Sequence, residues 1–330
     1  MTEFKSPKPN EASGAPDLTV VLVNYNTAHL FDRLFSTLNT ATRNLVVQTI
    51  LVDNASADDS VAILRSNYPA VELIENHDNV GFARANNQAL PLVRGRYVLL
   101  LNTDAFMAPD TLQKTLSFMQ AHPRCGVLGV KLVNDNGVLQ PSCRYFPTPW
   151  NTFLSATGLT KFFPNSRPID DMSWDHAAVR KCDWVPGCFY LTRRDVIERV
   201  GLFDPRFFLY YEEVDHCREV KGDGWEVVYY PFTQVVHIGG ESAKSEGTKL
   251  TDVGRQISAV QLESELLYFR KHHGRFGLAV AVFLSTCADI ASICKGLIRS
   301  NQARRAAASR HLTNVFHILT KTRMATRATR

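Results

Sequence analysis

The chain of 330 residues lacks the short motifs by which many ligand-binding proteins are recognised. It has no GxGxxG and no GxxxxGK[ST] pattern, which excludes the dinucleotide-binding fingerprint and the P-loop. Its seven cysteines form no CxxC pair, so we expect reduced thiols and neither a zinc knuckle nor a disulfide framework. Residues 1–17 contain no apolar run typical of a signal peptide, and their polar composition predicts a disordered tail.

Acidic residues are missing from the last part of the chain. Asp289 is the last carboxylate, and nine Lys or Arg residues follow it, although the net charge of the whole chain is only +5. A segment of one sign predicts a polyanionic partner, either nucleic acid or an anionic membrane surface. Residues 276–288 carry no charge. They are too few for a bilayer span of roughly 20 residues, so an interfacial helix fits better, with a buried core helix as the alternative.

The remaining sequence predicts an α/β fold. Hydrophobic residues make up 45% of the chain and charged residues 21%, which is enough apolar material for a sizeable core. Short apolar, β-branched runs alternate with segments of helical spacing, which predicts a parallel sheet with helices on both faces. We expect strands at 18–23, 49–52, 71–74 and 97–101. Asn134-Asp135-Asn136-Gly137 then predicts a β-hairpin between 126–133 and 138–144, so the sheet should become mixed.

Polar residues follow each of the four predicted parallel strands. Because the carboxyl ends of parallel strands meet at one edge of a sheet, these residues should line a single polar crevice. The run RYVLLLNTD places a carboxylate, Asp104, directly after the most apolar of these strands. A turn-capping Asp would be the alternative there. The other residues expected at this edge are Asn24, Asn26, Asp53, Asn54, Asn79, Gly81, Arg84 and Asn102.

Taken together and in order, these segments resemble a known family. VVLVNYNTAHL, ILVDNASADDS, NVGFARANNQAL and YVLLLNTDAFMAPDTL, and later DWVPGCFYLTRRDVIERVGLFDPRFFLYYEEVDHCREV and VVHIGGES, are similar to the family 2 inverting glycosyltransferases. The resemblance implies the GT-A fold, a Rossmann-like mixed sheet, and a nucleotide-sugar donor. It covers roughly residues 18–245 and is strongest for the rhamnosyltransferase branch, which builds bacterial cell-surface glycans.

The resemblance implies a donor and metal site at the polar crevice. Asp53 matches the carboxylate that binds the pyrimidine base, and Asp104 matches the last residue of the DxD motif, which binds Mg²⁺ or Mn²⁺. The first Asp of that motif is Asn102 here, whose amide oxygen can still bind a hard ion. His237 matches a histidine that completes the metal shell, although alone it would read as a core histidine. Arg84 and the helix beginning near Gly81 are expected at the phosphates, with a plain surface role for Arg84 as the alternative.

An acidic cluster supplies the candidate catalytic base. The family pattern places the base at Glu213, with Glu212 and Asp215 as alternatives. Carboxylates in the first turn of a helix are also stabilised by the helix dipole without any catalytic role. Trp184 and Gly187 match a segment that lines the acceptor site, although a strand ending in a Pro-Gly turn with a core Trp would give the same sequence. Residues 145–180 are predicted to be an irregular acceptor-side flap.

These observations predict three parts and one reaction. The parts are a tail (1–17), a glycosyltransferase domain (18–245, divided at 105 into donor and acceptor halves) and basic C-terminal helices (246–330) that associate with the membrane. The enzyme should move one sugar from a dTDP- or UDP-sugar to a glycan or polyprenyl-linked acceptor, since no Gln-x-x-Arg-Trp motif of processive synthases occurs. We expect it in the cytoplasm, peripheral on the inner face of the plasma membrane.

Two other classes remain open from the sequence. A nucleotidyltransferase shares the sheet and the metal carboxylate but needs no base at the position of Glu213. A non-catalytic nucleotide- or nucleic-acid-binding protein would use the basic C-terminal segment. The acidic cluster argues against a nucleic-acid backbone in the crevice, so we expect no nucleic-acid partner.

Overall fold

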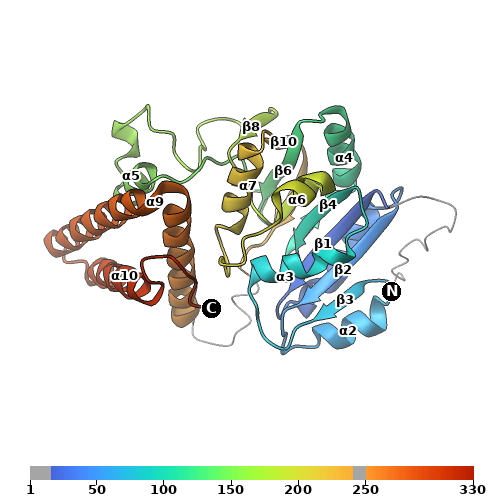
Figure 1. Ribbon diagram of the computed structural model, residues 1–330, viewed down its shortest axis with the longest axis horizontal. Helices are drawn as coiled ribbons and strands as arrows, with labels where there is room; N and C mark the ends of the chain where they lie inside the picture. Colours follow the sequence, from blue (N-terminus) through green and yellow to red (C-terminus); the bar gives the residue numbers. More distant parts are fainter. Residues whose placement is uncertain (1–15, 241–249) are drawn as a thin grey trace.

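The computed structural model describes residues 16–240 and 250–330, and its body is a ten-stranded mixed sheet (Figure 1). The main strand order is β3-β2-β1-β4-β9-β6-β10-β5, with β7 paired to β6 and β8 to β10. The strands are β1 (Leu18–Asn24), β2 (Val47–Asp53), β3 (Glu72–Glu75), β4 (Tyr97–Asn102), β5 (Ala105–Met107), β6 (Cys125–Val133), β7 (Leu139–Gln140), β8 (Arg180–Cys182), β9 (Phe189–Arg193) and β10 (Glu226–His237).

The first four strands are all parallel, and the second half of the sheet is mixed. β1 pairs in parallel with β2 and β4, and β2 with β3. β9 then runs antiparallel to both β4 and β6. The predicted α/β mixed sheet is thereby confirmed, as is the hairpin, in which β6 and β7 pair around Leu132 and Gln140.

Helices cover both faces of the sheet and create two hydrophobic cores. Strand residues alternate between them: Val21 and Leu100 lie in one core, and Leu22 and Leu101 in the other. The helices are α1 (Phe31–Ala41), α2 (Ser60–Asn67), α3 (Phe82–Ala89), α4 (Thr111–Ala121), α5 (Pro149–Thr157), α6 (Arg194–Val200), α7 (Glu212–Gly222), α9 (Leu250–Ile298) and α10 (Gln302–Lys321).

Two details of the predicted secondary structure are wrong. The sequence predicts two closing strands at 225–230 and 233–238, but the structure has one strand there, β10, which continues through a shift of register between Tyr230 and Gln234. The segment 145–180 is not irregular throughout, because it contains α5. Thr148 and Asn151 form a capping box around Pro149, and Gly158 ends the helix in the left-handed conformation. These capping signals are present in the sequence.

The C-terminal helices lie beside the sheet domain (Figure 1). α9 bends at Gly274, whose φ of 68° and ψ of −165° are not helical. The sequence His273-Gly274 predicts the end of a helix, but the structure has a kink there, after which α9 continues to Ile298. α10 packs back against α9, burying Val315 and Leu319. The proposed boundary at 245/246 and nearly all of the predicted N-terminal tail lie outside the described residues.

Candidate active site

The carboxyl ends of β1 and β2 are joined by buried polar side chains. Asn24 Nδ2 donates to Asp53 Oδ2 at 2.8 Å and to Ser56 Oγ at 2.9 Å. Asp53 is 2% exposed, and its other oxygen accepts the Ser56 amide at 2.9 Å. Asn26 Oδ1 accepts the Ala57 amide at 2.6 Å. The structure thus brings Asn24, Asn26 and Asp53 together, as the strand-end argument predicts.

A second set of amide side chains connects β2 to the loop before α3. Asn54 Nδ2 donates to Asn79 Oδ1 at 2.7 Å, and Asn54 Oδ1 accepts the Val80 amide at 3.0 Å. Asn79 Oδ1 also accepts the Gly81 amide at 3.0 Å. Asn54 directly follows Asp53 in the chain. These bonds therefore hold the loop before α3 at the same edge of the sheet as Asp53.

Main-chain amides at the start of α3, where the donor phosphates are expected, are hydrogen-bonded to groups of the protein. The Phe82 amide donates to the Phe208 carbonyl at 2.7 Å, and the Gly81 amide is held by Asn79. Gly81 has a φ of 87°, and a Cβ on it would lie 2.5 Å from Phe208 O. Arg84 donates to the main-chain oxygens of Pro205 and Arg330, each at 3.0 Å. These contacts do not join Arg84 to the other predicted donor-site residues, so its role at the phosphates stays a prediction, with a surface role as the alternative.

Asp104 and His237, the two predicted metal ligands, lie close together in the structure. Their strands are neighbours, because His237 pairs with Ala105 in the β5–β10 ladder. His237 Nε2 lies 3.5 Å from Asp104 Oδ1, and Asp104 Oδ2 accepts the Gly239 amide at 3.0 Å. His237 Nδ1 lies 3.1 Å from Gln140 Oε1. With Nδ1 donating to Gln140, the lone pair of Nε2 faces Asp104, which is the arrangement of a metal-binding histidine.

The donor set fits a hard divalent ion. Asp104 is 6% exposed, and Asn102 Oδ1 is buried without a hydrogen-bond partner among the described residues. A buried acceptor without a donor is costly unless something else binds it. A carboxylate oxygen, an amide oxygen and an imidazole nitrogen are all ligands that Mg²⁺ or Mn²⁺ accepts.

Glu212 and Glu213 begin α7 directly after a strained stretch of main chain. Both preceding residues, Tyr210 and Tyr211, are left-handed with φ of 68°, and the helix has no side-chain cap at its N-terminus. Such strain is typical of functional sites. One carboxylate oxygen of each glutamate, Oε2, is buried without a hydrogen-bond partner among the described residues. These two oxygens are therefore available to a ligand.

Glu213 lies close to the metal-type residues. Asn102 donates its amide to the Cys188 carbonyl at 3.1 Å, which brings the end of β4 beside the start of β9. The carboxylates of Asp104 and Glu213 both act on the buried Cys188 thiol and, after burial itself, raise its pKa. A Cβ on Gly187 would lie 4.0 Å from Glu213 Cβ. Cys188 and Gly187 thus lie between the predicted metal site and the predicted base.

The two glutamates differ in their electrostatics. Burial raises the pKa of Glu212 well above its usual range, and the neighbouring Glu213 raises it further. Burial also raises the pKa of Glu213, but the Arg144 guanidinium and the Gly187 amide act in the opposite direction. Glu213 is therefore the member of the pair that carries the negative charge more easily, as a general base must.

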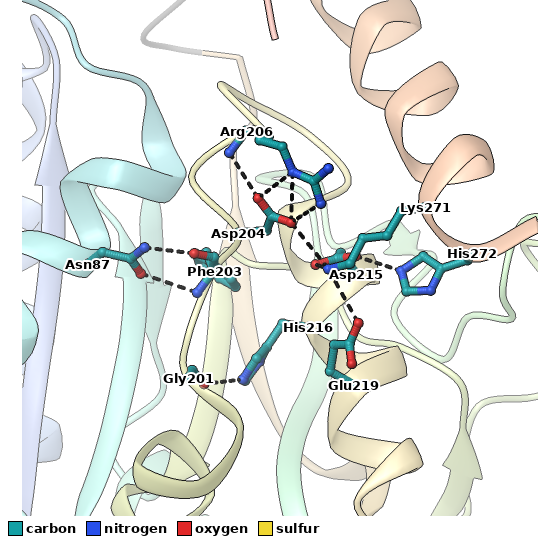
Figure 2. Close-up of polar contacts among 10 residues, drawn as sticks. All are labelled: Asn87, Gly201, Phe203, Asp204, Arg206, Asp215, His216, Glu219, Lys271 and His272. Carbon is teal, nitrogen blue, oxygen red and sulfur yellow. Dashed lines mark hydrogen bonds and ion pairs between the residues drawn. The ribbon is translucent and has the colours of Figure 1, made fainter. Parts of the chain in front are cut away.

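Two predicted site residues have other roles in the structure. Asp215 is 2% exposed, and its oxygens accept from Lys271 Nζ at 2.8 Å and His272 Nε2 at 2.6 Å (Figure 2). Trp184 is 5% exposed and donates its indole N–H to Tyr145 O at 2.9 Å. Asp215 is thus an ion-pair partner with no free oxygen, and Trp184 is the core tryptophan that the alternative interpretation described.

Sequence reasoning missed Arg144 and Gln140. Arg144 lies over the Trp184 ring at 4.0 Å and acts on Glu213 from there. Gln140 orients His237. Neither has a local signal in the sequence, since each acts on a residue far away in the chain.

Comparison with known proteins identifies the class. The profile of "Glycosyl transferase family 2" matches residues 19–174. The N-acetylglucosaminyl-diphospho-decaprenol L-rhamnosyltransferase of Mycobacterium tuberculosis is 28% identical over 246 residues, covering 67% of this chain and 75% of the relative. Rhamnosyltransferase WbbL of Escherichia coli is 25% identical over 218 residues, covering 59% of this chain and 80% of WbbL.

A solved structure gives the same fold. The mannosyltransferase PcManGT from Pyrobaculum calidifontis, in complex with GDP-Man and Mn²⁺, aligns with a TM-score of 0.55 and 16% identity, covering 97% of this chain and 92% of that one. The chain is therefore a glycosyltransferase with the GT-A fold. Its residues 19–174 match the family 2 model, and the chain is similar to rhamnosyltransferases.

Proposed function

We propose that this glycosyltransferase moves one sugar, rhamnose, from a nucleotide-diphosphate donor to a hydroxyl of a lipid-linked glycan acceptor, with inversion at the anomeric carbon. The observation that carries the proposal is the unpartnered carboxylate oxygen of Glu213, together with the action of both the Glu213 and the Asp104 carboxylates on the buried Cys188 thiol, whose pKa they raise. This juxtaposition provides a base for the acceptor next to residues suited to a divalent ion.

The donor end of the site is built from the strand ends. Asp53, with Asn24 and Asn26, is proposed to bind the base and ribose of the nucleotide. Asp104 and His237, with the amide oxygen of Asn102, would hold the Mg²⁺ or Mn²⁺ ion. When bound, the ion compensates the negative charge on the leaving diphosphate. The complex of the mannosyltransferase neighbour with GDP-Man and Mn²⁺ is consistent with this assignment.

Glu213 is proposed as the general base. Its free oxygen accepts the proton of the acceptor hydroxyl while that oxygen attacks the anomeric carbon on the face opposite the leaving group. Because the activated hydroxyl displaces the leaving group in a single step, the configuration of the anomeric carbon is inverted. Burial raises the pKa of Glu213, which makes it a stronger base, and hydrogen bonds from main-chain amides together with the Arg144 charge oppose that rise.

The sugar and the acceptor are proposed from the relatives. Both rhamnosyltransferases named above transfer rhamnose, and the mycobacterial one acts on a diphospho-decaprenol-linked sugar by its name. A dTDP- or UDP-sugar and a polyprenyl-linked acceptor in polysaccharide biosynthesis are therefore proposed for this chain.

The test is a donor panel with product identification. The protein is incubated with dTDP-rhamnose, UDP-glucose, UDP-galactose and GDP-mannose, each with Mn²⁺ and a polyprenyl-diphosphate-linked GlcNAc acceptor. We expect release of a nucleoside diphosphate and rhamnosylation of the acceptor, with dTDP-rhamnose the best donor. Release of the sugar 1-phosphate instead, with the nucleoside monophosphate joined to the acceptor, would identify a nucleotidyltransferase. Absence of turnover with all four donors would contradict the proposal.

The C-terminal helices are proposed to place the enzyme on an anionic membrane surface. After the kink, α9 exposes large apolar side chains at intervals of seven residues, which is two helical turns. They are Phe276 (83% exposed), Phe283 (66%), Ile290 (51%) and Leu297 (57%). Such an exposed stripe marks an interaction surface. The stretch Ala259–Ile298 is also long and apolar enough for a span by composition alone.

The charges favour a peripheral position over a span. Asp289 is 9% exposed and accepts from His311 Nδ1 of α10 at 2.8 Å, so this carboxylate faces the protein and not the apolar stripe. The nine cations that follow it would meet anionic lipid, each worth about 1 kcal/mol near the surface. This arrangement would hold the enzyme beside a lipid-linked acceptor on the cytoplasmic face.

Vesicle binding tests this position. The double variant Phe276→Ser/Phe283→Ser should bind vesicles containing 30% phosphatidylglycerol at least about tenfold more weakly than wild type, while turnover of a soluble acceptor is unchanged. Phe232→Ser is the control, because Phe232 is 55% exposed on the sheet domain. Wild-type binding should weaken as salt rises. Equal binding by all three proteins, or none by wild type at low salt, would contradict a membrane role.

A further inference from the structure

The first part of α9, before the kink, packs along the segment that carries the proposed base. Ser264 Oγ donates to the Leu209 carbonyl at 2.9 Å. The Arg218 guanidinium on α7 donates to Tyr268 OH at 2.9 Å. One contact therefore holds the loop before α7, and the other holds the second turn of α7 itself.

An ion cluster joins the two helices more strongly (Figure 2). Lys271 Nζ lies 2.8 Å from Asp215, 3.2 Å from Asp204 and 3.3 Å from Glu219. His272 Nε2 lies 2.6 Å from the other oxygen of Asp215. Burial alone would lower the pKa of Lys271, but the three carboxylates together raise it, so this side chain stays charged. We call Lys271, His272 and Asp215 the α7–α9 clamp.

The clamp acts on the first turn of α7, where local stabilisation is weak. Asp215 lies two residues after Glu213, and α7 starts at Glu212 after two left-handed tyrosines without a side-chain cap. The Asp215 amide donates to the Tyr211 carbonyl at 2.8 Å. With no cap of its own, this turn depends on contacts from outside α7. Asp215 receives them from α9.

A metal ion is the competing explanation for the same side chains. Asp215, Glu219 and His272 have ligand atoms within 4.8 Å of one another. However, the Lys271 ammonium already lies among these carboxylates and compensates their charge. A second cation there would be repelled at close range. The cluster is therefore an ion-pair junction between helices.

We propose that Lys271 and His272 are positioning residues that fix Glu213 through Asp215, so that α9 is part of the catalytic unit as well as the membrane-facing layer. The inference rests on the proposed role of Glu213. It predicts that loss of the clamp lowers kcat with little effect on donor KM, since the donor site is built from β1, β2 and β4. A misplacement of about 1 Å at a reacting group can cost roughly 10²-fold in rate.

The experiment compares five full-length variants with a soluble acceptor. We expect Lys271→Met to lower kcat at least about tenfold, with donor KM within about twofold of wild type. Lys271→Arg should restore kcat to within about threefold, because an arginine also reaches the three carboxylates. His272→Gln is a milder change that keeps a donor to Asp215, and it should lower kcat less than Lys271→Met. Lys181→Met is the matched control, as this exposed lysine pairs with Glu226 at 2.7 Å and should leave kcat unchanged.

Glu213→Gln, the fifth variant, separates failure of the proposed base from failure of the proposed positioning role. If Glu213→Gln stays active, the proposed base is wrong. If Glu213→Gln is inactive but Lys271→Met has wild-type kcat, the clamp has no positioning role. A loss in Lys271→Met that Lys271→Arg does not restore, or an equal rise in donor KM, would also overturn the inference. If Lys271→Met fails to fold, the other two variants decide. A wild-type kcat in His272→Gln together with a reduced kcat in Lys271→Arg would overturn the inference. A reduced kcat in His272→Gln together with a near wild-type kcat in Lys271→Arg would support it.

Discussion

The buried histidine of α7 predicts a loss of stability in mild acid. His216 is 1% exposed, and its Nε2 lies 3.0 Å from the Gly201 carbonyl (Figure 2). Its Nδ1 lies 2.6 Å from Tyr190 OH. Nε2 therefore donates to Gly201 and Nδ1 accepts from Tyr190, which is the hydrogen-bonding pattern of a neutral ring. Burial lowers the pKa of His216 from its ordinary value of 6.5 to about 4.

The sign and size of the effect follow from linkage. Because the unfolded chain binds the proton more readily than the folded one, stability must fall as pH decreases. The loss begins below about pH 6.5 and ends near pH 4, where the folded protein also takes up the proton. It amounts to about 3 kcal/mol, since one pKa unit is worth about 1.4 kcal/mol. Above pH 7 the histidine contributes no pH dependence.

Chemical denaturation at pH 7 and pH 4.5 measures this loss. His216→Gln should be less stable than wild type at pH 7, because a buried hydrogen-bonded group is changed, but its stability should fall by about 2–3 kcal/mol less between the two pH values. His317→Gln is the control, as His317 is exposed on α10 and should leave the wild-type pH dependence unchanged. If His216→Gln and wild type lose the same stability on acidification, the buried neutral histidine is not the cause.

Two further predictions concern the site itself. Asp104→Ala and His237→Ala should each weaken Mn²⁺-dependent donor binding by at least about tenfold in calorimetry, because a lost ligand leaves the diphosphate charge less compensated; full wild-type activity in EDTA would refute the metal assignment. Gly187→Ala should fold normally, since its Cβ would lie no closer than 3.6 Å to any neighbour outside its own chain segment, yet lower turnover by narrowing the space beside the proposed base; an unchanged kcat would place the acceptor elsewhere.

The sheet could be predicted from the sequence because its signals are local. Buried parallel strands such as Tyr97–Asn102 are short apolar runs that end in polar turns, and the Asn-Gly hairpin has a strong turn signal. The continuity of β10 could not be predicted, because Pro231 has no amide to donate to a strand ladder, although the strand accommodates a register shift at that point. α5 was missed because four prolines in the segment outweighed the capping box at Thr148.

The site was predictable where it depends on strand ends. Asp53 and Asp104 follow parallel strands, so topology alone places them at one edge. The role of Asp215 was not predictable, because its partners Lys271 and His272 lie 56 and 57 residues away on a helix with no recognisable motif. Arg84 is expected at the phosphates as a cationic donor, but in the structure its guanidinium donates to two main-chain carbonyls.

The central claim is that Glu213 accepts the proton of the acceptor hydroxyl, and a comparison of Glu213→Gln with Glu212→Gln tests it most directly. The two residues are adjacent, Glu212 is buried and Glu213 half-buried, and each has one buried, unpartnered oxygen among the described residues, so the two variants are matched. The measurement is single-turnover release of nucleoside diphosphate at saturating donor and acceptor. We predict a fall of roughly 10²–10⁴-fold for Glu213→Gln with donor affinity unchanged, and a much smaller fall for Glu212→Gln. Near-normal turnover in Glu213→Gln would contradict the account.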